Sequence, residues 1–527
     1  MLEGHNSKVY LVGGGIASLS AAVFLIKDAE VPGSNITIFE NSRVFGGSLD
    51  ADENNKDAYV MRGHRILAKK TFECTLDMLD HIPSITDTKK SVRQEMMEFN
   101  EQVKTYAKAR LIDCGRVVDA HSLGLSWRDR YDLFKVITKD ESDIQSKRIN
   151  EHFSNHFFKT NFWLEFRTVF AFQPWHSLVE FKRYLLRSFH ALSYYNTLEC
   201  IITAPLTQHD SFILPITKWL EEKGVKFWDE CRVFDLKIES ENRPKAIKNI
   251  LYNHKGQQKS ITLESHDHII ITLGSMTANT AVGSNTKAPD INIHKSSPSW
   301  SFWEKLARGN TNFGNPRAFD SHINRSSWES FTITFNNSLF FDLMEKLTGN
   351  KAGEGGGSTL KGSNWLMSIA IPHQPHFLGQ PKDKQICWGY SLAPDHKGNF
   401  VKKRMLDCSG QEILTELIRH LGFDKHKDKI LDSAICLPCI MPYITSQFSL
   451  RSKHDRPYII PSNIKNLGLI GQFVEIPDDV SFTIEYSIRS AQIAVYSLFN
   501  VNKKIPSIYK GHHNLKNIYK AIKTSLR

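Results

Sequence analysis

Residues 9–18 read Val-Tyr-Leu-Val-Gly-Gly-Gly-Ile-Ala-Ser, and the apolar run 36–39 leads to Glu40, 25 residues after Gly15. An apolar strand that turns through Gly13 and Gly15 into an alanine-rich helix brings backbone N–H groups close to a pyrophosphate. An acidic residue at the end of the second strand is placed to accept hydrogen bonds from a ribose 2′-hydroxyl. The stretch therefore predicts a site for an adenine dinucleotide without a 2′-phosphate, either FAD or NAD.

A second glycine pair follows the acidic residue. Gly46, Gly47 and Ser48 come where FAD enzymes often bring their backbone against the cofactor, so we prefer FAD over NAD. Ser18 stands where a third glycine is usual, and it is small enough for close packing of helix on strand. A glycine turn in some other α/β protein is the alternative, and the second glycine pair argues against it.

Two later segments predict strands that return to the same sheet. Residues 268–274 form an apolar run that ends at a glycine, which is typical of a buried parallel strand, and Ser275 follows it as a further cofactor candidate. Residues 466–471 repeat this pattern ahead of a helical pattern over 480–499. The dinucleotide domain is therefore expected to be discontinuous.

The predicted fold class is α/β, with a Rossmann-like, glutathione-reductase-type FAD-binding domain, an inserted helical part and a mixed-sheet substrate domain. A chain of 527 residues is longer than one core usually holds. We expect the FAD-binding domain at 1–120, 206–300 and 441–500, a helical pocket insertion at 121–205, a substrate-binding sheet at 301–440 and a basic helix at 501–527.

Two segments between these parts have unusual compositions. The aromatic block 161–176 is expected either as helix core or as the wall of an apolar pocket. The glycine-rich segment 350–363 is expected as a flexible loop rather than a phosphate cradle, because no strand leads into it and no helical pattern follows it.

Composition excludes several classes of protein. The net charge of +11 comes from basic residues mixed with acidic ones, so we expect no nucleic-acid partner. Cys436 and Cys439 have the spacing of half a zinc site, but nothing completes it, so we expect no metal. The chain has no pattern typical of a signal peptide and no apolar stretch of the roughly 20 residues that span a bilayer. A cytoplasmic protein is expected.

The C-terminal segment differs from the rest in charge. Residues 501–527 hold seven Lys or Arg and no acid, and apolar residues recur at helical spacing from Leu515 to Leu526. Such a helix can dock on the protein body or lie on an anionic lipid surface. Peripheral contact with a membrane is therefore one of two expectations for this segment.

Several blocks, taken together, resemble the oleate hydratases, also called the myosin-cross-reactive antigen family. With the opening unit they lie in order from residue 9 to about residue 480 and so cover nearly the whole chain. They are Gly46-Gly-Ser-Leu-Asp50, Met61-Arg-Gly-His-Arg65, Phe72-Glu-Cys-Thr75, Phe170-Ala-Phe-Gln-Pro-Trp-His-Ser177, Gln374-Pro-His-Phe377, Trp388-Gly-Tyr390, Met441-Pro-Tyr-Ile-Thr-Ser-Gln447 and Gly471-Gln-Phe-Val-Glu-Ile-Pro-Asp-Asp479.

The resemblance implies an FAD-containing hydro-lyase that adds water to the cis double bond of an unsaturated free fatty acid such as oleate, giving a 10-hydroxy acid. It also implies that FAD undergoes no net redox change and that the protein is a homodimer. Two alternatives remain open. One is a redox flavoenzyme of the amine-oxidase or phytoene-desaturase type, and the other is a fatty-acid- or FAD-binding protein that has lost catalysis.

The family's substrate residues carry over to three positions. The proton donor becomes Tyr184, and the residues that bind the fatty-acid carboxylate become Gln208 and His376. A Thr and an Asn of some members fall on Ala370 and Pro372, so head-group binding is expected to differ here.

The loop after the first unit departs from the family pattern. Many members have Arg-Gly-Gly-Arg-Glu, whose Glu orients or activates the attacking water, whereas this chain has Arg62-Gly-His-Arg-Ile66. Isoleucine cannot accept a proton. We hypothesise that His64 or backbone carbonyl groups near the flavin position the water, and we assign Arg65 and Ile66 to the same catalytic loop.

The family's flavin contacts also carry over. Glu40 matches the ribose-binding acid, and Ser48 matches the serine of the second glycine block. Arg65 is assigned to the cofactor as well as to the catalytic loop. Asp479 and Thr483 are expected where the final helix meets the cofactor.

Overall fold

The computed structural model describes residues 7–49, 51–52, 58–239, 244–290 and 297–526. Asp50, which ends the second glycine block, and Arg527, which ends the basic segment, lie outside these ranges.

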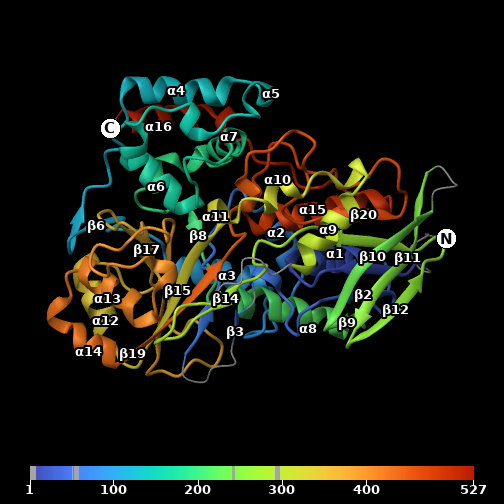
Figure 1. Ribbon diagram of the computed structural model, residues 1–527, viewed down its shortest axis with the longest axis horizontal. Helices are drawn as coiled ribbons and strands as arrows, with labels where there is room; N and C mark the ends of the chain where they lie inside the picture. Colours follow the sequence, from blue (N-terminus) through green and yellow to red (C-terminus); the bar gives the residue numbers. More distant parts are fainter. Residues whose placement is uncertain (1–6, 50, 53–57, 240–243, 291–296, 527) are drawn as a thin grey trace.

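A five-stranded parallel sheet forms the first layer of the fold (Figure 1). Helices α1 (Ile16–Lys27) and α15 (Ile484–Leu498) pack against each other beside it. All residues of its two central strands β1 and β13 are buried except those at the ends of β13, as expected for a parallel sheet covered on both faces. In spatial order the strands are β20 (Leu467–Ile470), β13 (His268–Thr272), β1 (Val9–Val12), β2 (Ile36–Phe39) and β9 (Lys226–Trp228).

The strand order shows why this domain is discontinuous. Strand β1 pairs with β2 and β13, and β13 pairs with β20, all in parallel. The sheet thus joins segments from both ends and from the middle of the chain. The helix after β20 begins at Ile484, four residues later than the helical pattern suggested, because the Thr483 side chain caps it by accepting a hydrogen bond from Tyr486 N at 3.2 Å.

An eight-stranded mixed sheet forms the second layer, and with it the predicted α/β class is confirmed. Strands β6 and β7, which the division by sequence assigned to the first domain, extend this sheet instead. In spatial order the strands are β14 (Ala281–Val282), β19 (Ala434–Met441), β15 (Trp328–Phe335), β18 (Gln385–Ser391), β17 (Met367–Ala370), β16 (Ser358–Leu360), β6 (Leu111–Asp113) and β7 (Arg116–Val118).

The glycine-rich segment 350–363 is not simply a loop. It contains β16, which pairs in parallel with β6 and antiparallel with β17. A methyl group built on Gly356, where φ is +63°, would lie 2.7 Å from Leu198 Cδ1, so this glycine allows a close approach of chain to side chain. The expectation of a flexible loop was wrong because pairing with distant strands fixes the segment.

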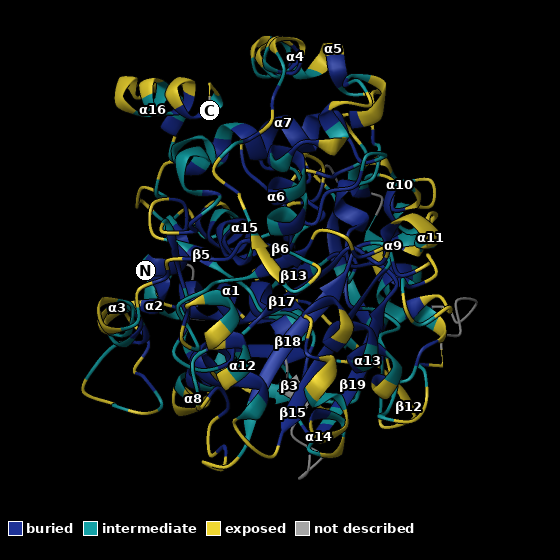
Figure 2. Cartoon of the chain, turned by 90° about the vertical axis from the view of Figure 1, so that its left-hand side faces the viewer, coloured by how far each residue is buried: buried dark blue, intermediate teal, exposed yellow. Residues whose placement is uncertain are grey.

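Helices α4 (Trp127–Thr138) and α16 (Leu515–Ser525) lie at the same end of the molecule (Figure 1), and Arg130 Nε of α4 donates to Ser525 O at the end of α16 at 2.7 Å. Figure 2 shows that both present exposed faces. Large apolar side chains are exposed on both helices and directly after α16: Trp127, Tyr131, Phe134, Leu515, Tyr519, Ile522 and Leu526. None of the described helices is long and apolar enough to cross a bilayer.

Candidate active site and cofactor cavity

A cavity of about 700 Å³ opens at the carboxyl ends of the parallel strands. This is where ligands bind in open α/β sheets. The N-terminus of α1 faces the cavity through the glycine turn. Its lining includes Gly13, Gly14, Gly15, Glu40, Gly47, Ser48 and Ser275, all from the two glycine blocks or from the ends of β2 and β13.

The glycine turn has the form that a dinucleotide cradle requires. Gly13 has φ of +99°, and the Gly14 N–H donates to Glu40 Oε2 at 2.7 Å. A methyl group on Gly14 would lie 2.6 Å from Phe45 Cδ1, whereas one on Gly15 would have only Gly47 Cα near it, at 3.8 Å. Space at Gly15 is therefore free of protein atoms on the cavity side, and the residues present fit a pyrophosphate.

We expect Gly15→Ala to weaken flavin binding while the fold stays intact. The added methyl group meets no close protein atom, but it stands between the backbone N–H groups and the pyrophosphate that they would bind. The measurement is the fraction of flavin retained, read from the absorption spectrum, together with the thermal midpoint of the apoprotein. Gly14→Ala is the matched comparison, because there the methyl group collides with Glu40 and Phe45 and lowers the midpoint as well. Full flavin retention by Gly15→Ala would contradict this assignment.

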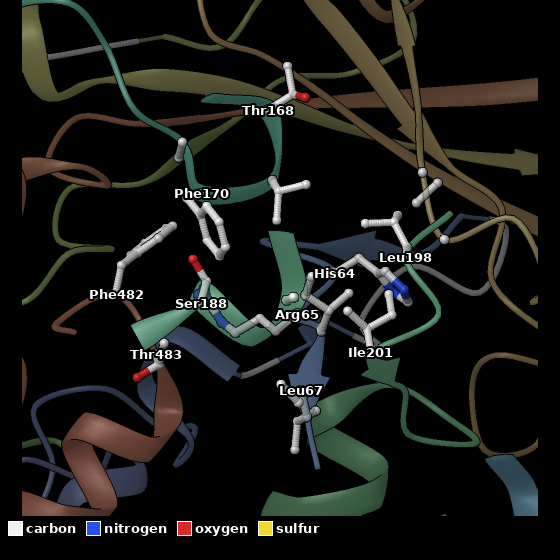
Figure 3. Close-up of a pocket in the computed structure, with 18 of the residues that line it drawn as sticks. His64, Arg65, Leu67, Thr168, Phe170, Ser188, Leu198, Ile201, Phe482 and Thr483 are labelled. Atoms are coloured by element: carbon white, nitrogen blue, oxygen red, sulfur yellow. The ribbon is translucent and has the colours of Figure 1, made fainter. Parts of the chain in front are cut away.

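A second cavity, of about 220 Å³, lies beside the first and is lined mainly by apolar side chains. Arg65 joins the two, because it lines the apolar cavity while its Nη2 donates to the carbonyl oxygen of Ser48 at 3.3 Å. Figure 3 shows His64 and Arg65 between Phe170 and Phe482 on one side and Leu198 and Ile201 on the other. The aromatic block thus supplies part of a pocket wall.

Tyr184 lines this apolar cavity. Its hydroxyl accepts a hydrogen bond from the Phe482 N–H at 3.0 Å, and its own proton has no hydrogen-bond acceptor among the residues that the structure describes. The Phe170 ring packs edge-on against the Tyr184 ring, with centroids 5.1 Å apart. Burial raises the pKa of Tyr184 well above its usual 10, so the hydroxyl stays protonated at neutral pH.

Helix α7 (Leu178–Arg187) holds this tyrosine through one buried face. Glu180, Arg183, Tyr184 and Arg187 are spaced three or four residues apart, so their side chains lie on the same side of the helix. All four are buried. A face with three charged groups needs partners from the packed elements.

The partners come from the chain around β20 and α15. Glu180 Oε1 lies 2.9 Å from Arg451 Nε and 3.2 Å from Arg456 Nη2. Arg187 Nε lies 3.2 Å from Asp479 Oδ1. These ion pairs fix α7 against the segment that carries Phe482, and so they fix the tyrosine against its backbone donor.

His64 and Ile66 line the same cavity as Tyr184. His64 Nδ1 is buried and has no hydrogen-bond partner among the described residues. Burial lowers the pKa of His64 to about 4, so the imidazole is neutral at physiological pH and can accept a hydrogen bond. Ile66 contributes only apolar surface.

Gln208 and His376 lie in a small recess that His64 and Ser48 also line. The Gln208 amide is occupied: its Nε2 donates to Arg65 O at 2.6 Å, and its Oε1 accepts from Arg65 N at 3.3 Å. The His376 ring lies 5.5 Å from the His64 ring, and burial holds the pKa of His376 well below its usual range. Both side chains are therefore neutral, and Gln208 shapes the Arg65 loop.

Three predicted cofactor residues do not line the cavities. Ser18 is fully buried under the glycine turn, where its hydroxyl lies 3.0 Å from Thr272 Oγ1. Gly46 supports the turn through its N–H, which donates to Gly14 O at 2.9 Å. Asp479 pairs with Arg187 and with Arg489 Nε at 3.1 Å. Thr483 lines the apolar cavity.

No group of three metal-binding side chains occurs among the residues that the structure describes. Cys436 and Cys439 are free thiols buried in β19.

A family model described as MCRA family matches residues 6–496. The chain belongs to the MCRA family. One MCRA relative is an oleate hydratase of Streptococcus pyogenes serotype M49 (strain NZ131), 36% identical over 98% of this chain and 90% of the relative. Another is a linoleate hydratase of Lactiplantibacillus plantarum, 31% identical over 94% of each chain. The resemblance stated from sequence is thus confirmed.

Among solved structures, the cyclohexylamine oxidase of Brevibacterium oxydans IH-35A is similar to this member of the MCRA family with a TM-score of 0.50. The two are 11% identical, and the match covers 94% of this chain and 99% of the oxidase. At that identity the likeness concerns the fold alone.

Proposed function

We propose that this chain is an FAD-containing fatty acid hydratase, a hydro-lyase that adds water to the cis double bond of an unsaturated free fatty acid of the oleate type. The observation that carries the proposal is the Tyr184 hydroxyl, protonated and buried in an apolar cavity that adjoins the dinucleotide cavity. The names of the two curated relatives support the substrate class.

FAD fits the larger cavity through Gly13, Gly15, Gly47, Glu40, Ser48 and Ser275. When bound, the flavin supplies a polar wall and an electrostatic field for the reaction, with no net redox change. The proposed cofactor contacts of Arg65, Asp479 and Thr483 are indirect: Arg65 through Ser48, and the other two through the segment that leads into α15.

The reaction needs an acid, a held water molecule and dry walls. The Tyr184 O–H proton goes to one alkene carbon, and the oxygen of water bonds to the other. The proton that this water loses restores the tyrosine, so the sum is alkene plus water. His64 Nδ1 accepts a hydrogen bond from the water, and Arg65, 5.8 Å from the Phe482 ring, helps to close the cavity.

The proposed function is tested by incubating the protein with FAD and oleate or linoleate in ¹⁸O-labelled water under reducing conditions. Mass spectrometry should find a hydroxy acid with one added, labelled water. In a separate anaerobic incubation without added reductant, reduction of the flavin by substrate would indicate a redox flavoenzyme instead. Lipid binding without any hydroxy acid would indicate a binding protein that has lost catalysis, a second candidate that the isoleucine at position 66 favours.

We expect His64→Ala to lower kcat by about 100-fold, the low end for a residue that assists proton transfer. The pKa of about 4 means that wild-type activity that depends on neutral His64 is constant above about pH 6 and falls as the pH approaches 4. The pKa of His64 in the folded protein lies below the usual 6.5. The contribution of the neutral imidazole to the stability of the protein is therefore complete above pH 6.5 and is lost as the pH falls through 4. The measurement is kcat against pH for both proteins; equal kcat values would reject the histidine and leave backbone carbonyl groups to hold the water.

Gln208 and His376 remain the proposed substrate-binding pair. Their recess meets the apolar cavity at His64, which lines both. A homodimer is proposed from the family alone and is tested by sedimentation.

We also propose contact with a membrane surface through α16 together with α4. Exposed apolar side chains on both helices and three lysines on α16 suit an anionic bilayer. Vesicles of phosphatidylglycerol should bind the protein more tightly than vesicles of phosphatidylcholine, as measured by co-sedimentation. Equal or absent binding to both would reject the contact.

A further inference from the structure

One part of the apolar cavity has a polar wall. Arg110, directly before β6, lines the cavity there with Thr359 of β16, Ser368 of β17 and Tyr390 of β18. The Thr359 and Ser368 hydroxyls share a hydrogen bond of 2.9 Å, and the Tyr390 hydroxyl donates to the carbonyl oxygen of Thr168. These elements come together only in the folded mixed sheet.

The Arg110 side chain is buried, with 3% of its surface exposed. Its Nε donates to the carbonyl oxygen of Tyr195 at 3.1 Å, and its Nη1 donates to that of Gly357. Its Nη2 is buried and has no hydrogen-bond partner in the described ranges. A buried guanidinium with an unsatisfied donor is costly unless an anion completes its hydrogen bonds.

One buried acid lies near Arg110 without forming a hydrogen bond to it. Glu165 of α6 (Asn161–Phe170) is fully buried and makes no hydrogen bond through either carboxylate oxygen. Burial raises the pKa of Glu165 to about 7, against the attraction of Arg110. Glu165 therefore makes no hydrogen bond to Arg110, and the guanidinium Nη2 stays available to a ligand.

We propose that Arg110, through its free Nη2, binds the carboxylate of the fatty acid, with the Thr359 and Ser368 hydroxyls beside it. The proposal rests on the proposed function and adds to it the charged partner of the head group, which the neutral Gln208 and His376 cannot supply.

The position of Arg110 suits a ligand whose reacting carbons lie some way along a chain from the carboxylate. Arg110 contacts the Tyr195 backbone, the Tyr195 ring lies 6.1 Å from the Phe170 ring, and the Phe170 ring lies 5.1 Å from that of Tyr184. An apolar stretch therefore separates the guanidinium from the proton donor. A free acid with several methylene groups between carboxylate and double bond fits both ends, whereas an ester leaves Arg110 without an anion.

The test compares oleate with methyl oleate in the wild-type holoenzyme, Arg110→Gln and Arg110→Lys. We expect Arg110→Gln to raise KM for oleate roughly 10- to 100-fold, as for loss of one charge-assisted hydrogen bond, and to change the methyl ester kinetics little. Arg110→Lys should restore part of the preference for the acid. Arg116→Gln, at an exposed arginine of β7, is the matched comparison and should leave the preference for the acid unchanged.

Oleate binding, followed by quenching of the fluorescence of Trp328 and Trp388 in the cavity wall, gives a readout without turnover. Two results together would separate the two proposals: no hydroxy acid from the wild type, and weaker oleate binding by Arg110→Gln. They would refute the proposed function but support the head-group site. An unchanged acid-to-ester preference and unchanged oleate affinity in folded Arg110→Gln would overturn the head-group site. If Arg110→Gln does not fold, Arg110→Lys decides the question. Wild-type affinity of Arg110→Lys for oleate supports the head-group site. A folded Arg110→Lys that binds oleate no more tightly than the ester overturns the site.

Discussion

Tyr184→Phe should lower kcat by about 10²- to 10⁴-fold, the usual contribution of a positioned acid, and should leave flavin and oleate bound. The substitution removes one oxygen atom from a buried ring and keeps its aromatic contacts with Phe170 and Phe448. The Phe482 N–H loses its acceptor, which costs some stability but no flavin contact. The measurement is single-turnover hydration of oleate, with flavin content and oleate affinity determined on the same sample.

Tyr195→Phe is the matched control for this experiment. Tyr195 also lines the apolar cavity, but its hydroxyl lies 2.6 Å from Ser188 Oγ and is committed to that hydroxyl. We expect Tyr195→Phe to keep most of the activity. Equal activity of wild type and Tyr184→Phe would remove Tyr184 from the mechanism, and an equal loss in both variants would mean that packing rather than acidity is responsible.

The second large effect is expected on stability, from Glu180→Gln. The carboxylate of Glu180 lies fully buried between Arg451 and Arg456. The amide has nearly the same shape but no charge, so Arg456 loses its counter-ion inside the protein and Arg451 keeps only Glu475, at 3.3 Å. Removal of one partner from a buried ion pair costs about 3–5 kcal/mol. Urea denaturation of the holoprotein measures the change.

Glu151→Gln provides the comparison at the surface. Glu151 pairs with Arg148 at 3.2 Å, and both side chains are solvent-exposed to a third or more, so we expect a loss below about 1 kcal/mol. A loss as small for Glu180→Gln would contradict the central role of its ion pairs.

The pKa of Glu180 predicts how the contribution of this carboxylate to stability changes with pH. The arginines around Glu180 lower its pKa to about 2 against the opposing effect of burial. A folded pKa below the unfolded value of about 4.3 means that the stabilisation is complete above that value and is lost as the pH falls through 2. The difference in stability between wild type and Glu180→Gln should therefore shrink below about pH 4.

The sequence predicted those features that depend on neighbouring residues in the chain. The glycine turn, Glu40 and the apolar strands could be recognised because local spacing determines them, and the pairing of β1, β13 and β20 follows from their apolar runs. The start of the final helix was placed too early because the cap at Thr483 is a matter of side-chain geometry.

Features that depend on distant contacts could not be predicted in this way. Nothing in the local pattern separates Arg110 from a surface arginine, because its burial depends on strands that begin about 250 residues later. The Gln208 amide is occupied by the Arg65 backbone, a contact across 143 positions. The site residues carried over from the family remain predictions until the variants above are measured.

Because the proposed proton donor and three charged anchors share one face of α7, this helix offers little freedom for protein engineering. A change at Glu180, Arg183 or Arg187 alters the support of the catalytic hydroxyl together with the stability of the whole protein. Libraries that aim at new chain lengths should therefore leave α7 untouched. They should vary the opposite walls, at Leu198, Ile201 and Ala370, where apolar side chains line the cavity without carrying an ion pair.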